Sequence, residues 1–304
     1  MIASMVPAAV SVQAADGDSI RLVNGKIEVD AQLKKLAEMY EKETGTKVEI
    51  ESMGGGIDIQ GTLKGYYQSD NMPDIFVNGS GADFANWTDM LVDMSDQKWA
   101  SDTDAAYVDE SQGTIGFPYT TEAIGLAYNK DILDEAGATV PTTWAEVQET
   151  AQKIKDKFGD DVYPWGIDMT TDEGQAAFSY YTWNNGGGFV DENGDWALNS
   201  DKNVEALNFA IGLVNDGYTN SDPANETRYD LQDMFGAGKV AMMIGPNNIP
   251  TYLSDGGYDI NYDVTTIPAN EGCDSVAMGV CDRLEVFKDD SAEDQEARTA
   301  AISK

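Results

Sequence analysis

The sequence predicts an α/β fold divided into two lobes, and three observations support this prediction. The chain has 304 residues, more than one hydrophobic core usually supports. Hydrophobic residues make up 41% of it, which is enough for packed cores. Patterns typical of strands and helices alternate along the chain, and no low-complexity linker interrupts them. Extended segments rather than a flexible tether should therefore join the lobes.

The N-terminal part of the chain is predicted to alternate between strand and helix. Strands are expected at 19–23, 47–51 and 73–77, where short apolar or alternating runs end at turn residues. Apolar residues recur at helical spacing over 33–40, and a second helix is expected through 63–67. This order predicts a parallel sheet with helices on both faces.

Three loops follow these strands, and they are the first candidate binding segments. Ligands of open α/β sheets bind beyond the carboxyl ends of the strands. The run Gly54-Gly55-Gly56 lacks the Gly-Lys-Ser/Thr that follows in a nucleotide-binding loop, so we expect it to bring backbone amides close to another kind of ligand. The candidate binding residues of the three loops are Asn24, Lys26, Gly55, Asp58, Asn78 and Asp83.

The second half of the chain continues the alternation of elements. Thr143 and Glu146 have the spacing of a capping box and predict a helix that runs to Phe158. The segment 191–195 (DENGD) lacks the later glutamate of a calcium loop and predicts a hairpin turn. Extended segments are expected at 116–128, 239–244 and 260–267, and helices at 175–182, 203–214 and 229–235.

The charge of the chain limits its partners. Nineteen Lys and Arg against 54 Asp and Glu give a formal net charge of −35. Such a surface repels phosphate backbones and anionic lipid headgroups, so we expect no binding of nucleic acid. It also disfavours an anionic ligand, unless the few cations converge on one site.

Histidine and cysteine usage narrows the chemistry further. The sequence has no histidine, which excludes Ser-His-Asp and Cys-His nucleophile arrangements and removes the commonest metal ligand. We therefore expect no catalytic residues, no metal and no cofactor. Cys273 and Cys281 have the wrong spacing for a zinc or redox motif, and either a local disulfide or two free thiols fit the sequence equally well.

The first 15 residues resemble the end of a secretory signal. The apolar stretch MIASMVPAAVSVQAA ends in a small-x-small pattern before Asp16, although no Lys or Arg precedes Arg21. We interpret residues 1–15 as a signal-peptide remnant and expect a protein exported across the cytoplasmic membrane, periplasmic or associated with the cell surface. No segment of the sequence has the apolar length of a membrane-spanning helix.

Four segments in order resemble the extracellular sugar-binding proteins of ABC importers, a family that includes maltodextrin-binding proteins. They are YEKETGTKV at 40–48, FPYTTEAIGLAYNKD at 117–131, PTTWAEV at 141–147 and FGAGKVAMMIGP at 235–246. Each segment alone is weakly specific, but their order and spacing make the resemblance strong, and it covers nearly all of 19–268.

The resemblance implies a type II periplasmic-binding-protein fold, with two α/β lobes that close on a ligand in the cleft between them. Mapped onto this sequence, the N-terminal lobe is 16–120 plus 265–304, and the C-terminal lobe is 121–264. It also implies capture of a carbohydrate, an oligosaccharide in our interpretation, and its delivery to the membrane permease of an importer by a monomeric protein. An acidic residue that hydrogen-bonds sugar hydroxyls in the family falls on Glu122, a role that suits a carboxylate.

Departures from the family pattern put the identity of the sugar in doubt. Many relatives carry a tryptophan after the segment KVAMMIGP, where this chain has Asn247 and Asn248, both candidates for hydroxyl contacts. Aromatic rings pack on the C–H faces of sugars, and the aromatic candidates beside the predicted loops are Tyr66, Tyr119, Trp165, Trp183 and Tyr252. The chain also stops within a predicted helix after 291–293, where the family normally continues, so either the sequence is truncated or the protein is a shortened variant.

Two other functions fit parts of the sequence. The acidic balance and Glu122 suit a receptor for polyamines or other cations, which requires several converging carboxylates and an aromatic box. A glycoside hydrolase needs only a pair of carboxylates, and a pair can always be nominated among 54 acidic residues. No segment supplies a recognisable catalytic motif, so binding of a carbohydrate remains the preferred hypothesis.

Overall fold

The computed structural model describes residues 19–53, 57–79, 82–103, 116–170, 173–288 and 292–303. The chain divides into two compact units, which we call the first unit (1–121 and 280–304) and the second unit (122–279). The predicted signal remnant at 1–15 and Gly55 lie outside the described residues. No helix among the residues that the structure describes has the length and apolar character required to cross a bilayer.

The first unit is built on a mixed sheet with the strand order β2-β1-β3-β8. Strand β1 pairs in parallel with β2 and β3, as predicted, and β8 runs antiparallel to β3. The strands are β1 (Ile20–Asn24), β2 (Val48–Ser52), β3 (Ile75–Asn78) and β8 (Gly279–Val286). The helices of this unit are η1 (Ile27–Val29), α1 (Asp30–Thr44), α2 (Ile59–Gln68), α3 (Ala82–Ala85), η2 (Thr88–Met90), α4 (Lys98–Asp102) and α11 (Ala292–Ser303).

Alternation along these strands divides the core of the first unit into two layers. Leu22 and Ile75 pack in one layer with Leu33 of α1 and the end of α11. Their neighbours Val23 and Phe76 pack in the other layer with α2. Because successive side chains of a strand point to opposite faces, the short apolar runs at 19–23 and 73–77 supply both layers.

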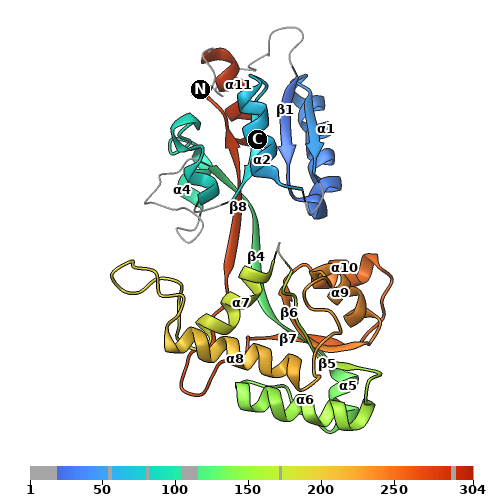
Figure 1. Cartoon of the computed structure of the whole chain (residues 1–304). Coiled ribbons are helices and arrows are strands. Elements are labelled where there is room, and N and C mark those ends of the chain that lie inside the picture. Colours follow the sequence, from blue (N-terminus) through green and yellow to red (C-terminus); the bar gives the residue numbers. More distant parts are fainter. Residues whose placement is uncertain are drawn as a thin grey trace, which may run out of the picture. The chain divides into compact units, whose positions relative to one another are not determined.

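The second unit is built on the strand order β7-β4-β6-β5 (Figure 1). Strand β4 is antiparallel to β6 and β7, whereas β5 and β6 are parallel. The strands are β4 (Gly116–Asn129), which the two units share along the chain, β5 (Tyr163–Gly166), β6 (Val240–Pro246) and β7 (Tyr262–Thr265). The helices are α5 (Lys130–Ala136), α6 (Trp144–Phe158), α7 (Gly174–Trp183), α8 (Asp201–Asn215), α9 (Arg228–Gly236) and α10 (Ile249–Asp255).

Helices cover both faces of this second sheet. One core layer joins Leu126 and Met242 of the sheet to the apolar sides of α6 and α8. The other layer joins Ala127 and Met243 to α9 and α10, which lie side by side (Figure 1). The sheet is therefore sandwiched between two helical layers, as in the first unit.

Local sequence signals in the second unit are confirmed. The Thr143 hydroxyl accepts a hydrogen bond from the Glu146 amide, and the Glu146 carboxylate accepts one from the Thr143 amide, which completes the predicted capping box. The DENGD segment forms a hairpin turn, because Val190 and Trp196 pair antiparallel around it. Cys273 and Cys281, for which the sequence left two states open, are free thiols.

One predicted boundary differs from the observed units. The sequence assigned 265–304 to the N-terminal lobe, but residues 265–279 belong to the second unit. Thr265 pairs with Leu126 in the sheet, and Ile267 is buried in its core. Farther along, the side-chain amide of Asn184 bonds both the backbone N–H and the carbonyl of Val276 at 2.8 Å. These long-range bonds hold the whole segment on the second unit.

Candidate functional site

Predicted binding residues of the first unit gather at the carboxyl ends of β1 and β3. The Lys26 ammonium pairs with the Asp282 carboxylate at 2.6 Å, and both side chains are largely buried. The Asn24 amide bonds the backbone N–H and carbonyl of Lys26 at 3.0 Å, which fixes the turn after β1. Thr120 donates a hydrogen bond to the same Asp282 carboxylate.

A chain of side-chain hydrogen bonds connects α2 to the sheet of the first unit. The Trp87 indole donates to Gln60, whose amide donates to Asn78, and the Asn78 amide donates to the Glu285 carboxylate at 2.7 Å. Glu285 has 0% exposure, and burial raises the pKa of its carboxyl to about 8. Its second oxygen, Oε1, has no hydrogen-bond partner among the described residues.

The side-chain amides of the candidates Asn24 and Asn78 thus form hydrogen bonds with other groups of the chain. Both side chains are buried, and the hydrogen bonds that their amides make fix the loops that follow the strands. The sequence could not show this, because Glu285 is 207 residues from Asn78. Direct contact of these two residues with a ligand stays a prediction.

Asp58 and Asp83 lie close enough in the first unit for their charges to interact. Asp58 caps α2 by accepting a hydrogen bond from the Gly61 amide. Burial raises the pKa of Asp83, the nearby Lys64 ammonium lowers it, and the Asp282 and Asp58 carboxylates raise it, with a net increase. These two carboxyl groups remain candidates for contact with a ligand.

Tyr119 lies on β4 within the first unit. Its ring packs at the edge of the apolar core, and its buried hydroxyl has no hydrogen-bond partner among the described residues. Burial, followed by the charges of Glu28 and Asp30, raises the pKa of Tyr119 to about 12, so the phenol is neutral at physiological pH. Its role in binding stays a prediction.

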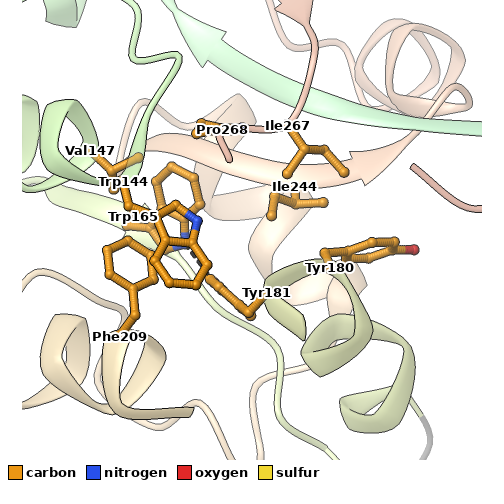
Figure 2. A pocket seen from close by; sticks show the side chains of 9 residues that line it. All are labelled: Trp144, Val147, Trp165, Tyr180, Tyr181, Phe209, Ile244, Ile267 and Pro268. Atoms are coloured by element: carbon orange, nitrogen blue, oxygen red, sulfur yellow. Dashed lines mark hydrogen bonds between the residues drawn. The ribbon is translucent and has the colours of Figure 1, made fainter. Parts of the chain in front are cut away.

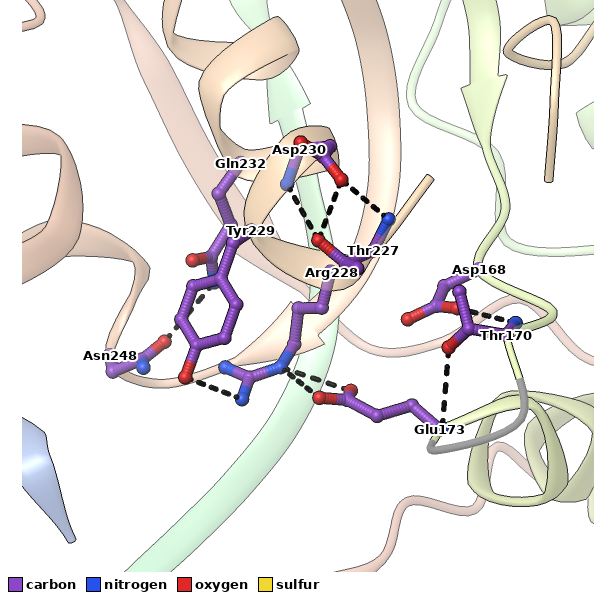
Figure 3. A network of polar contacts seen from close by, with 9 residues as sticks. All are labelled: Asp168, Thr170, Glu173, Thr227, Arg228, Tyr229, Asp230, Gln232 and Asn248. Carbon is purple, nitrogen blue, oxygen red and sulfur yellow. Dashed lines mark hydrogen bonds and ion pairs between the residues drawn. The ribbon is translucent and has the colours of Figure 1, made fainter. Parts of the chain in front are cut away.

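A polar network of the second unit surrounds Arg228 at the start of α9 (Figure 3). The Glu173 carboxylate accepts two hydrogen bonds from the Arg228 guanidinium, at 2.9 and 3.0 Å, and the guanidinium lies 4.7 Å from the centre of the Tyr229 ring. Asp168 accepts a hydrogen bond from the Thr170 amide, and the Thr170 hydroxyl accepts one from the Glu173 amide. These contacts link the start of α9 to the N-cap residue of α7 and to the loop that follows β5.

Glu122 belongs to the electrostatic environment of this network. Burial, followed by the negative charges of Glu173 and Glu122, raises the pKa of Tyr180 to about 12. Burial lowers the pKa of Arg228, but the Glu173 carboxylate and, more weakly, the Glu122 carboxylate raise it, and the net shift is upward. The structure thus places Glu122 within electrostatic range of the partly buried Arg228 guanidinium and of Tyr180, all within the second unit.

A pocket of about 580 Å³ opens in the second unit beside the middle of β4 and the carboxyl ends of β6 and β7. None of the described residues that line it carries a charge, in a chain with a formal net charge of −35. A side chain at Gly125 would lie 2.8 Å from the Thr265 carbonyl oxygen, so glycine permits the close strand approach beneath the pocket. The polar lining side chains are Asn247, Thr265, Thr266 and Ser275, and the aliphatic ones are Ala123, Ile124, Pro246, Pro250, Val264, Ile267 and Ala277.

The comparisons with known proteins agree with this architecture. The family model of bacterial extracellular solute-binding proteins matches residues 24–278. The chain belongs to this family. A maltooligosaccharide ABC transporter solute-binding lipoprotein of Streptococcus pneumoniae is 27% identical over 253 residues, which cover 78% of this chain and 56% of that protein. A multiple sugar-binding protein of Streptococcus mutans is 29% identical over 148 residues, covering 47% of this chain and 35% of that one.

Solved structures share the fold of this solute-binding protein. The maltose-bound MalE3 of T. maritima superposes with a TM-score of 0.80 at 24% identity, covering 94% of this chain and 76% of that one. A ribitol complex from Agrobacterium radiobacter superposes with a TM-score of 0.79 at 24% identity, covering 95% and 76%. The type II periplasmic-binding-protein fold is thus shown. The chain spans about half the length of the curated relatives that it matches.

Among the aromatic candidates of this solute-binding protein, Trp165 is a core residue. It is 1% exposed, and its indole donates a 2.9 Å hydrogen bond to the Tyr181 hydroxyl (Figure 2). The rings around it leave a cavity of about 10 Å³, which is about the space for one water molecule (Figure 2). Its strand is covered by α6 and α8, and stacking of Trp165 on a sugar stays a prediction.

The remaining candidates are partly accessible. Trp183 is half-buried beside Tyr180 and Phe189, and the Tyr252 hydroxyl donates a hydrogen bond to Asp233. Asn248 accepts a hydrogen bond from the buried Gln232. Asn247 lines the uncharged pocket, together with residues 264–267, Ser275 and Ala277, which the sequence did not nominate. The predicted extended segment at 260–267 was the signal that could have drawn attention to them.

Proposed function

We propose that this protein is the carbohydrate-binding component of an ABC importer, and that the pocket beside Asn247 contacts the sugar. The observation that carries the proposal is the pocket's uncharged lining. Sugars present C–H surfaces and hydroxyl groups, which suit aliphatic walls with a few amide and hydroxyl side chains. Its volume of about 580 Å³ lies within the usual range for small-molecule sites.

Relatives support the same ligand class. Their names and titles give maltooligosaccharides for the Streptococcus pneumoniae lipoprotein, and maltose and ribitol for the two solved structures. We infer that the partner of this chain is the membrane permease of an importer, and that binding involves no chemical conversion of the ligand. Incubation with oligosaccharides should accordingly leave them intact, and release of shorter sugars would contradict this part of the proposal.

A receptor for a cationic ligand is the second candidate, and the polar network of the second unit favours it. Glu173 and Glu122 bring two carboxylates near one guanidinium, that of Arg228. Arg228 already occupies the Glu173 carboxylate through two hydrogen bonds, and the pocket itself has no acidic lining residue. The carbohydrate therefore fits the available surface better.

A thermal-shift panel separates these candidates. Neutral mono- and oligosaccharides are compared with putrescine and spermidine, each at the highest practical concentration. A ligand at one hundred times its dissociation constant stabilises the folded protein by about 2.7 kcal/mol, which raises the melting temperature by several degrees. We expect this shift with at least one sugar and with neither polyamine. A shift with the polyamines alone would contradict the proposed function.

A further inference from the structure

We propose that Glu285 and Arg283 form a pH-sensitive switch in the first unit. While its carboxyl is protonated, Glu285 stays on the Asn78 amide and the Arg283 guanidinium stays on the Phe84 ring, as the structure shows them. Once the carboxyl ionises, Glu285 pairs with Arg283 and draws the guanidinium away from Phe84. The inference concerns the first unit alone and does not depend on the carbohydrate pocket, whose described lining belongs to the second unit.

Arg283 is a buried cation in an acidic protein. It is 6% exposed, and no hydrogen bond or ion pair joins its guanidinium to another residue that the structure describes. Its partner is an aromatic ring, because the guanidinium carbon lies 5.5 Å from the centre of Phe84. Buried charges in proteins are normally paired with an opposite charge, and a cation–π contact replaces only part of that attraction. The guanidinium therefore retains the capacity to bind an anion.

Glu285 is the acidic side chain within reach of Arg283. Residues 283 and 285 are two apart on β8, so their side chains point to the same face of the sheet. Both pass over Gly116, where an added Cβ atom would lie 3.1 Å from Arg283 Cδ and 3.1 Å from Glu285 Cγ. The Oε1 atom of Glu285 has no hydrogen-bond partner among the described residues. A guanidinium and a carboxylate so placed can form two parallel hydrogen bonds after side-chain rotation.

Protonation decides between the two arrangements. Burial raises the pKa of the Glu285 carboxyl to about 8, so the group is neutral near pH 7 and the Asn78 bond suffices for it. The groups that β3 and α2 bring to this network, Phe76, Asn78 and Gln60, are uncharged, and the charge that acts on Glu285 is that of Arg283. The other charged side chains of this region influence Asp83 and not Glu285; they are Asp58, Lys64 and Asp282.

The switch acts on α3, the helix that carries the candidate ligand contact Asp83. Arg283 rests on Phe84 of this helix, and the Asn78 amide lies 3.5 Å from the Asp83 carbonyl oxygen. Pairing of Glu285 with Arg283 removes the cation from Phe84 and releases the Asn78 amide from the carboxylate that orients it. Two contacts that hold α3 on the sheet thus change together when Glu285 ionises.

A double-mutant cycle at two pH values tests the pairing. Unfolding equilibrium constants are measured in urea for the wild type, Glu285→Gln, Arg283→Met and the double variant, at about pH 6 and about pH 9.5, on either side of the ionisation of Glu285. We expect the two residues to be coupled by about tenfold or more at the higher pH and by less than about twofold at the lower pH. Equal coupling at both values would reveal a permanent ion pair, and no coupling at either would show that the two never pair; each result would overturn the switch.

Trp87 reports the switch in protein that keeps Arg283, in case Arg283→Met does not fold. Its indole donates to Gln60, whose amide donates to Asn78, so it is connected to Glu285 through hydrogen bonds. In protein labelled with 5-fluorotryptophan, with the signal assigned by Trp87→Phe, the ¹⁹F resonance of Trp87 should titrate with a midpoint at about pH 8. The titration should vanish in Glu285→Gln and persist in the control Glu41→Gln. A resonance that does not titrate, or that titrates equally in Glu285→Gln, would overturn the inference and leave the proposed carbohydrate binding untouched.

Discussion

At the residue scale, Glu285 is a carboxyl group held where its charge is unfavourable. It accepts one hydrogen bond from Asn78, and burial raises its pKa to about 8 from an ordinary value of 4.5. The folded protein therefore binds a proton here that the unfolded chain releases above pH 4.5. Stability from this group is fully present below that pH and is lost as the pH rises to about 8.

Replacement of Glu285 by glutamine should remove this pH dependence. The amide oxygen of Gln can still accept the hydrogen bond from Asn78, and it carries no charge at any pH. The unfolding free energy of Glu285→Gln minus that of the wild type should rise by roughly 3–5 kcal/mol when the pH is raised from about 5 to about 8.5. Urea denaturation at the two pH values measures the difference.

Glu41→Gln is the control for this experiment, because it removes an exposed carboxylate of the same unit. Its effect should be small and nearly independent of pH. A Glu285→Gln variant that behaved in the same way would show that Glu285 ionises normally in the folded protein.

Single residues also mark the limit of what the sequence could predict. Thr143 and Glu146 were predicted as a capping box because both partners lie within one turn. The burial of Trp165 could not be predicted from a local pattern, because it depends on packing against α6 and α8. Likewise, the bond between Asn78 and Glu285 joins two strands that pair only in the folded sheet.

At the element scale, helix α8 has two faces of different character. Ala206, Ala210 and Leu213 are buried against the core, whereas Val204, Leu207, Ile211 and Val214 form an exposed aliphatic stripe. The sequence predicted the helix at 203–214. Because both of its faces are apolar, the sequence could not show which face is buried.

Two leucine substitutions on α8 distinguish its faces. Leu213 has 0% exposure, so Leu213→Ala should lower the unfolding free energy by about 2–5 kcal/mol through loss of packing and a residual cavity. Leu207 is 44% exposed, and Leu207→Ala should change it by no more than about 0.5 kcal/mol. Equilibrium denaturation of both variants gives the comparison. Equal losses would mean that the outer face of the helix is also covered.

At the scale of the whole molecule, the division of the chain was partly visible in the sequence. Strand-helix alternation and the ordered family segments predicted the fold that the solved relatives share. The boundary after the second unit was placed at 264 instead of 279. The segment 265–279 contains no strong helix or strand pattern, and isolated hydrogen bonds such as those of Asn184 hold it in place. Elements with their own periodicity were predictable, whereas a segment fixed only by distant partners was not.

The pocket likewise emerges only from the assembled second unit. Asn247 was nominated from its place after β6, but its aliphatic neighbours come from β4, β7, α10 and the segment 275–277. No local pattern in the sequence links these residues. The absence of charge from their surroundings is a property of the folded chain.

The central claim is that a carbohydrate binds in the uncharged pocket beside Asn247. The most direct test is calorimetric titration of the sugar identified by the thermal panel into the wild type, Asn247→Ala and Asn208→Ala. Asn208 is an exposed amide on α8, outside the pocket lining, and serves as the matched control. We predict that Asn247→Ala weakens binding about tenfold or more, since a lost hydrogen bond at a ligand costs on the order of 1.5 kcal/mol, and that Asn208→Ala binds like the wild type. Unchanged affinity in Asn247→Ala would contradict the claim.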